Sequence, residues 1–339
     1  MAGAKDFSAV NTKISGMGKN LFNTSDYNYI MSLSQKDILN FLMEKEFIKA
    51  TDFQDLDYLS VHLKRILIEK MEALSNFMAK DYKILMDLII DRYKIDDVKK
   101  AIRNIYNGNT GFNKENFVIE EDFYNSVNSG VNISDFIKTL SKERYYDYIR
   151  NYSDKVGSEI LFYLEMSLDR FHYSDIYKYC EKLDRKSKKK AKELFGTIID
   201  LKNVTWIYRA KKYYDVDDTL IYNYSIFRGL KFGIDDLLKM SKMDFDSFMN
   251  FIKNTEYSVK FFGDGDKDID MSLTNDIFLY SKFKDYFKSM EFNMGKVLGY
   301  ILIYEFQIKD IMVIMQGKEM KMNKESIKDY LICYEERRF

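Results

Sequence analysis

The chain has 339 residues, with 53 basic and 53 acidic side chains, two cysteines and no proline. A length above roughly 250–300 residues favours two or three structural units over a single core. Zero net charge argues against a general nucleic-acid binder and against a coat on an anionic membrane, because both normally carry a basic surplus. Two cysteines provide no disulfide framework and fit a reducing compartment.

Apolar side chains recur at helical spacing through most of the chain. The i, i+3, i+4 stripes run over residues 58–90, 156–179, 187–214 and 281–316. Turn-forming residues cluster at 107–111, 128–130, 215–218 and 263–266. Strict alternation over the length of a strand is scarce. We therefore predict an all-α fold, with an irregular linker near residues 110–133.

No segment predicts a membrane span. The N-terminus lacks an apolar signal core, and the longest uncharged apolar run near the C-terminus covers only residues 297–304. A membrane helix needs ~20 apolar residues. We expect any membrane association to go through a partner.

A nine-residue pattern occurs three times, starting at Ile95, Leu201 and Ile308, which are 106 and 107 residues apart. Each copy reads aliphatic, any residue, Asp or Asn, then Val or Ile, with aliphatic side chains on one helix face. The Asp or Asn suits the first turn of a helix. Chance similarity between helix-rich segments is the alternative to a true repeat.

A weaker second mark precedes the copies, at residues 40–42, 147–149 and 250–252. Two independent marks at near-constant separation favour a true triplication. We predict three similar helical units, covering residues 1–115, 116–217 and 218–339.

Three segments carry motifs in a constant order. They are FSAVNTKI at residues 7–14, IDLKNV followed by YRAK at 199–211, and EFQIKDI followed by GK at 305–318. Together they resemble the C subunit of V-type and A-type ATPases (ATP synthases), the counterpart of the d subunit of the eukaryotic vacuolar ATPase. Two positions depart from the family pattern. Asp310 stands where the family usually has Asn, and Met312 where it often has Arg.

The resemblance implies a fold and a function. The fold would be three similar all-α domains around a pseudo-threefold axis, shaped like a funnel. Its wide mouth would bind the D and F subunits of the central stalk, and its other side would sit on the membrane rotor ring of proteolipid subunits. The chain would be cytoplasmic and peripheral on the inner face of the membrane, with a contact to the membrane part of the stator also open. It would transmit torque during proton or sodium transport without catalysing a reaction.

The motifs that suggest catalytic, cofactor or metal chemistry fail on inspection. The Gly-Lys pairs at residues 18–19 and 317–318 lack the first Gly and the Ser or Thr of a phosphate loop. The acidic run from Asp264 to Asp270 lacks the Gly and Glu of a calcium loop and is read as a surface turn. His62 and His172 have no ligand-type neighbour at zinc spacing. We predict no catalytic, cofactor or metal residues, and no nucleic-acid partner.

Four basic residues are the candidate partner-binding residues. Arg103 and Arg209 share one repeat position, and Lys211 and Lys318 lie just beyond it in their copies. In a threefold funnel, equivalent positions surround one axis, so these residues would form a partly basic ring. Ordinary solvent exposure at helix ends is the alternative.

A further basic run covers residues 185–192. A solvated helix start is the favoured interpretation, because acidic residues flank the run. Contacts with nucleic acid, lipid headgroups or an acidic patch on a stalk protein are the alternatives.

Two other functions stay open at the level of sequence. An unrelated α-helical repeat scaffold would bind some other protein, and neither shaft binding nor recruitment by the rotor ring would be expected. An enzyme with a dispersed site would show turnover, or a pocket in which polar groups converge.

Overall fold

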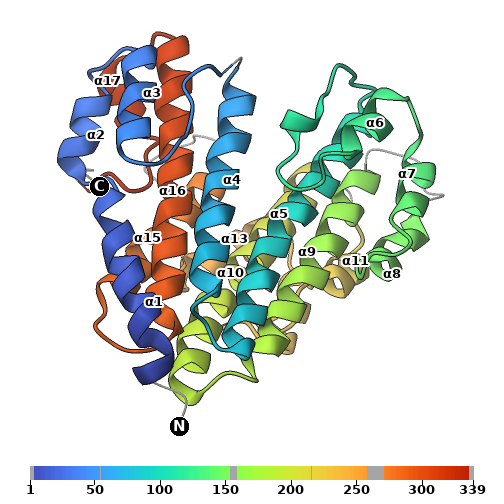
Figure 1. The fold of residues 1–339 in the computed structure, drawn as a ribbon. Coiled ribbons are helices and arrows are strands. Elements are labelled where there is room, and N and C mark those ends of the chain that lie inside the picture. The colour runs from blue at the N-terminus through green and yellow to red at the C-terminus, as the bar shows by residue number, and fades with distance from the viewer. Residues whose placement is uncertain (1–3, 54, 153–158, 215, 258–270, 336–339) are drawn as a thin grey trace. The chain divides into compact units, whose positions relative to one another are not determined.

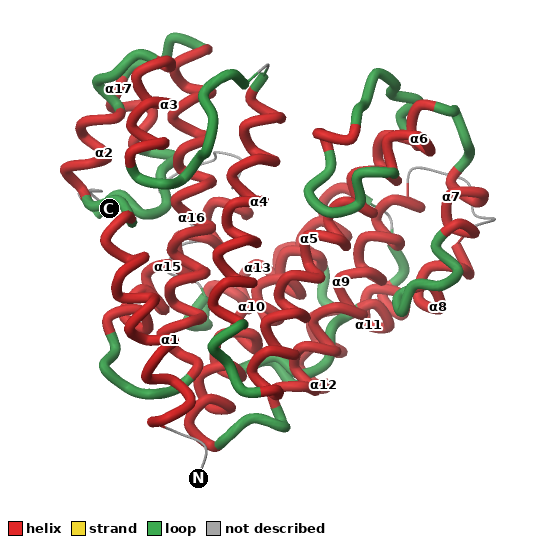
Figure 2. Tube along the Cα trace, in the orientation of Figure 1, coloured by secondary structure: helices red, strands yellow, loops and turns green. Residues whose placement is uncertain are grey.

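The computed structural model describes residues 4–53, 55–152, 159–214, 216–257 and 271–335. Every regular element in these ranges is a helix, and Figure 2 shows no strand among them. The prediction of an all-α fold is confirmed. The chain forms two compact units, one of residues 1–86 with 272–339 and one of residues 87–271.

The first unit contains helices from both ends of the chain. Its helices are α1 (Ala4–Met17), α2 (Thr24–Ile30), α3 (Gln35–Glu44), α4 (Leu56–Ser75), α15 (Met271–Lys288), α16 (Met294–Glu319) and α17 (Lys324–Lys328), with the 3₁₀ turn η1 (Gly18–Asn20). Helix α5 (Lys80–Tyr106) begins in this sequence range and continues into the second unit.

The second unit is continuous in sequence. After α5 come η2 (Lys114–Asn116), α6 (Phe123–Asn128), α7 (Ile133–Thr139), α8 (Tyr146–Ile149), η3 (Arg150–Tyr152), α9 (Glu159–Cys180), α10 (Arg185–Tyr213), α11 (Asp218–Tyr224), α12 (Ile234–Lys242) and α13 (Phe245–Lys253). The predicted linker at 110–133 is thus mostly irregular, with two short helical pieces.

Two of the predicted apolar stripes are divided by turns. The stripe over 58–90 breaks between α4 and α5, and the stripe over 281–316 breaks between α15 and α16. Asn293 begins α16, and its side chain accepts a hydrogen bond from the backbone N–H of Gly295. An Asn cap starts a helix without glycine or proline, so periodicity alone does not reveal these turns.

Helix α16 is the centre of the first unit, packed against α1 and α4. It is apolar almost all round, which is typical of a core helix. Tyr300, Tyr304 and Phe306 on it are buried, and Tyr304 stacks on Phe47 with ring centroids 4.4 Å apart.

Gly299 lies where α16 touches the end of α15. A Cβ at this position would lie 2.4 Å from the backbone nitrogen of Phe287 and 2.8 Å from Cβ of Tyr286. Backbone atoms cannot rotate away, so α15 would have to shift. We expect Gly299→Ala to lower the free energy of unfolding by about 1–3 kcal/mol in urea denaturation.

Gly16 is the matched control, because it lies in α1 and a Cβ there meets nothing within 4 Å. Gly16→Ala should leave stability unchanged or raise it slightly, since alanine favours helix. Equal losses in the two variants would contradict the packing argument.

Residues of the N-terminal segment pack around the C-terminal half of α16 and form hydrogen bonds with it. Figure 1 shows α2, α3 and α17 gathered around this end. The side-chain amide of Gln307 bonds both backbone groups of Phe22, accepting from its N–H at 3.0 Å and donating to its carbonyl at 2.9 Å. The Tyr27 hydroxyl donates to Asp310 at 2.7 Å. Residues nearly 300 positions apart therefore form one buried polar contact.

The second unit has its main core between α5, α9 and the short helices α6 to α8. Buried apolar residues from all of these helices meet there, including Val98, Phe117, Phe136 and Leu164. Helices α11, α12 and α13 pack against α10. The long helices α5 and α10 are thus each followed by short helices that pack against them.

Candidate functional site

The repeated Asp or Asn occupies equivalent surroundings in all three copies. Asp97, Asn203 and Asp310 are 2%, 1% and 0% exposed, respectively. They lie inside α5, α10 and α16, so the interpretation that they mark helix starts is wrong. The reason is that their side chains bind backbone groups of a following segment, which a buried polar group requires.

The partners of these residues follow at nearly constant distance in the chain. Asp97 accepts from the backbone N–H groups of residues 118, 119 and 120 at 2.9, 2.7 and 2.9 Å. Asn203 accepts from the N–H of Ile226 at 2.8 Å and donates to its carbonyl at 2.9 Å. Asp310 accepts from residues 332 and 333 at 2.6 and 2.8 Å. In each copy, the side chain on the long helix thereby binds the backbone of the segment 21–23 residues later in the sequence.

A second position, one helical turn earlier, binds in the same manner in two copies. Asp200 accepts from the backbone N–H groups of Lys231 and Phe232 at 2.7 and 3.3 Å, as Gln307 does from Phe22. Phe22 and Phe232 are 210 positions apart in the sequence. Burial raises the pKa of Asp200 to about 6, against the opposing hydrogen bonds from the Tyr257 hydroxyl and backbone N–H groups.

Lys211 and Lys318 also make equivalent contacts. The Lys318 ammonium donates to the carbonyl of Met31, at the end of α2, at 2.6 Å. The Lys211 ammonium donates to the carbonyls of Ser241, at 2.7 Å, and Met243, at the end of α12. Met31 and Ser241 are again 210 positions apart. Both lysines neutralise the carbonyl end of a short helix.

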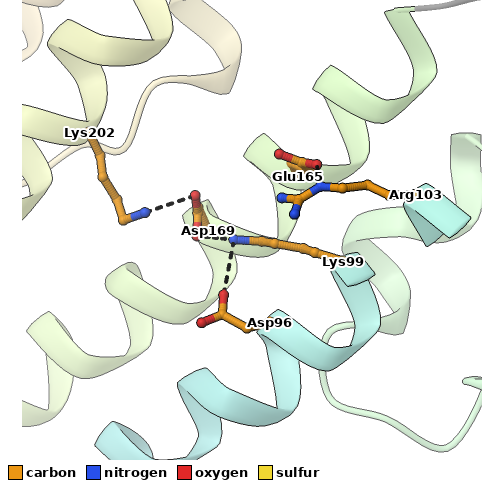
Figure 3. Close-up of polar contacts among 6 residues, drawn as sticks. All are labelled: Asp96, Lys99, Arg103, Glu165, Asp169 and Lys202. Carbon is orange, nitrogen blue, oxygen red and sulfur yellow. Dashed lines mark hydrogen bonds and ion pairs between the residues drawn. The ribbon is translucent and has the colours of Figure 1, made fainter. Parts of the chain in front are cut away.

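Arg103 belongs to a charged cluster on α5, α9 and α10. Its Nε lies 2.5 Å from Glu165 of α9, and its side chain is 51% exposed. Asp169, one turn along α9, lies between Lys99 of α5 at 2.6 Å and Lys202 of α10 at 3.1 Å, as Figure 3 shows. The cluster therefore links three long helices through their charged side chains.

Charged neighbours shift the pKa values of three groups in this cluster, Asp169, Lys202 and Arg103. Burial would raise the pKa of Asp169, but Lys202 and Lys99 outweigh it and hold the pKa well below its usual range. The pKa of Lys202 is raised, because the attraction of Asp169 outweighs the cost of burial. The pKa of Arg103 is raised by its hydrogen bond and charge interaction with Glu165, which outweigh burial.

Part of this arrangement recurs in the first unit. Lys309 of α16 binds Asp276 of α15 at 2.7 Å, as Lys202 of α10 binds Asp169 of α9. Lys202 and Lys309 are 107 positions apart in the sequence, and so are Asp169 and Asp276. Sequence reasoning missed the acidic partners, although a search for charges at the repeat period would have found them.

The four candidate residues differ in how accessible they are to a partner. Arg103, Arg209 and Lys211 lie in the second unit and Lys318 lies in the first. Arg209 is half-buried on α10, with its guanidinium 5.0 Å from the centre of the Trp206 ring. The Lys211 side chain is only 8% exposed, whereas that of Arg103 is 51% exposed. Arg103 is therefore better placed than Lys211 to contact another protein.

The histidines have structural surroundings. His62 accepts the backbone N–H of Lys49 at 3.3 Å. His172 is buried, and burial together with Arg92 lowers its pKa to about 3, so its ring is neutral. Within the described ranges no group of three His, Cys, Asp or Glu side chains is placed to hold a metal ion. The acidic run from Asp264 to Asp270 lies outside the described residues.

Among the helices that the structure describes, none combines the length and apolarity needed to cross a membrane.

The sequence as a whole matches a known family. The profile of the ATP synthase (C/AC39) subunit matches residues 10–330. The chain belongs to this family. The predicted resemblance is confirmed.

Relatives in the family span almost the same length. The C subunit of the A-type ATP synthase of Methanosarcina mazei is 24% identical over 348 residues, which cover 97% of this chain and 94% of the relative. The corresponding protein of Methanosarcina barkeri is 23% identical with the same coverage. That of Methanococcoides burtonii is 20% identical, covering 97% of this chain and 95% of its own.

Proposed function

We propose that this member of the family is a non-catalytic central-rotor subunit of an A-type or V-type rotary ATPase. It couples the D and F subunits of the central stalk to the proteolipid rotor ring during proton or sodium transport. The match to the ATP synthase (C/AC39) subunit over residues 10–330 carries this proposal. A peripheral position on the inner face of the membrane and a contact with the stator belong to the same proposal.

The threefold, funnel-like architecture is part of the proposal. The equivalent contacts of Asp97, Asn203 and Asp310 support three copies of one unit. The matching contacts of Lys211 and Lys318 support the same conclusion. The third copy would include α2 and α3 from the N-terminal part of the chain. The boundaries between the units at residues 115 and 217 remain predictions.

The partner-binding role of Arg103, Arg209, Lys211 and Lys318 also remains a proposal. Arg103 and Arg209 are its best test, because their guanidinium groups do not hold backbone carbonyls in the described structure. We expect Arg103→Glu with Arg209→Glu to weaken binding of the D–F complex at least tenfold, about 1.4 kcal/mol, by charge repulsion. Biolayer interferometry with the D–F complex of the same organism measures this.

Lys36→Glu with Lys138→Glu is the control, with the same charge change at two exposed lysines. Its affinity should stay within about threefold of the original chain. Unchanged affinity of the arginine variant for the D–F complex would show that neither arginine lies in the interface. Failure of the unaltered chain to bind the D–F complex would overturn the rotor role itself.

A further inference from the structure

The turn between α9 and α10 concentrates positive charge in a chain that is neutral overall. Residues 178–193, here called the basic turn, contain eight basic and three acidic side chains. Figure 1 shows this turn at one end of the α9–α10 helix pair. The surplus is therefore local and lies at the tip of a helical hairpin.

Two of the three acidic residues in the basic turn are engaged within the turn itself. Glu181 binds Lys192 and, at 3.4 Å, Lys188. The Asp184 carboxylate caps α10 and accepts from the backbone N–H groups of Lys186 and Ser187 at 2.9 and 3.3 Å. These two carboxylates are thus already occupied within the turn.

Three cations of the turn face solvent. Arg185, Lys186 and Lys189 are exposed, and within the described part of the chain no carboxylate lies within ion-pair distance of them. Arg185 and Lys189 are four residues apart, so they share one helix face, with Lys186 beside them. The three charges form a short ridge on the first turns of α10.

The position of these charges is unfavourable for the helix. Helix N-termini favour negative side chains, and several other helices, among them α3, α4 and α12, carry an acidic residue in the first turn. Helix α10 has none in its first turn. The Asp184 carboxylate caps this end of α10 and offsets part of the cost. The part that Asp184 does not offset points to a role outside the fold.

We propose that the basic turn is a docking surface for an acidic helical segment of a partner protein. The ridge from Arg185 to Lys189 spans about 6 Å, at 1.5 Å per residue. That length is below the Debye length of ~8 Å at physiological ionic strength, so the three charges act together on a nearby acidic segment. Exposed charges farther than this from the segment are largely screened by salt. A broad anionic membrane is less suited as the partner, because the chain as a whole carries no basic surplus. The inference rests on the proposed function only in taking the partner to be another protein of the same assembly.

The test uses the full chain and two fluorescein-labelled helical peptides, one with glutamates four residues apart and one with glutamines in their place. Fluorescence anisotropy should show binding of the glutamate peptide at about 50 mM NaCl, weakening steeply by about 300 mM. The variant Arg185→Glu with Lys186→Glu and Lys189→Glu should lose at least tenfold in affinity. Its melting temperature should rise, because the new acids suit the start of α10.

The matched control is Lys36→Glu with Lys83→Glu and Lys142→Glu, the same charge change at exposed positions on other elements. It should lose less than threefold. Equal losses in the two variants, equal binding of the glutamine peptide, or no binding would overturn the proposal. Binding to vesicles with about 30% phosphatidylserine that competes with the peptide would reassign the turn to lipid and overturn it too.

The D–F complex separates this inference from the proposed function. A chain that binds the D–F complex but no acidic peptide contradicts the docking surface alone. A chain that binds the peptide through the basic turn but not the D–F complex contradicts the rotor role alone.

Discussion

Replacement of Asp310 by alanine should lower the free energy of unfolding by about 3–5 kcal/mol, because three buried hydrogen-bond donors lose their acceptor. These donors are the N–H groups of residues 332 and 333 and the hydroxyl of Tyr27. Asp310 itself is fully buried, so water does not reach the site in the folded chain. Urea denaturation followed by circular dichroism gives the value.

Two further variants separate this effect from a general loss of an aspartate. Asp310→Asn keeps one carbonyl oxygen but turns an N–H₂ group toward the donors, so we expect an intermediate loss. Asp285→Ala removes an exposed carboxylate that lies 3.7 Å from Lys288, and it should change stability by no more than about 0.5 kcal/mol. Similar losses at positions 310 and 285 would contradict the role assigned to Asp310.

Replacement of Asp169 by alanine should cost about 3 kcal/mol, because it removes the buried carboxylate between Lys99 and Lys202. The carboxylate that remains beside Lys99 is that of the exposed Asp96, at 3.9 Å. The Lys99 side chain is 8% exposed, whereas that of Lys202 is 29% exposed and keeps some contact with water. The expected loss is therefore at the lower end for a broken buried ion pair.

The triple variant Lys99→Met, Asp169→Leu and Lys202→Met is the decisive comparison. It removes all three charges and should recover most of the stability lost in Asp169→Ala, since apolar packing replaces buried ion pairs at little cost. A triple variant as unstable as the single one would show that packing, and not the unpaired lysines, causes the loss.

The same cluster predicts a pH dependence. The pKa of Asp169 is held below its usual range in the folded chain, so its contribution to stability is present above the unfolded pKa of ~3.9. It is lost as the pH falls further and the carboxyl gains a proton. The stability difference between the original chain and Asp169→Ala should be constant from about pH 7 to pH 5 and shrink below about pH 4.

Helical periodicity was enough to predict the fold class and the positions of the long helices. It did not reveal the turns before α5 and before α16, because the turn at α16 depends on an Asn side chain and the stripe continues across both. The repeat of Asp97, Asn203 and Asp310 was visible in the sequence, but its meaning was not. Only the structure shows that these side chains bind backbone groups more than 20 residues away.

The candidate site was predictable in part. Arg103 was found from its repeat position, whereas its partner Glu165 and the neighbouring Asp169 were not. Lys211 and Lys318 were correctly paired by the repeat, yet their contacts with helix-end carbonyls depend on how α12 and α2 fold back. Such contacts follow from tertiary packing, which helical spacing does not encode.

The closure of α16 by the N-terminal segment has a consequence for synthesis on the ribosome. Residues 22–31 emerge early, but the helix that binds them begins only at Met294. At about 5–20 residues per second, roughly 10–50 s pass between the two. The second unit is continuous and has all its residues before that moment. The first unit must therefore assemble last, because Phe22, Tyr27 and Met31 gain their partners only after α16 has been synthesised.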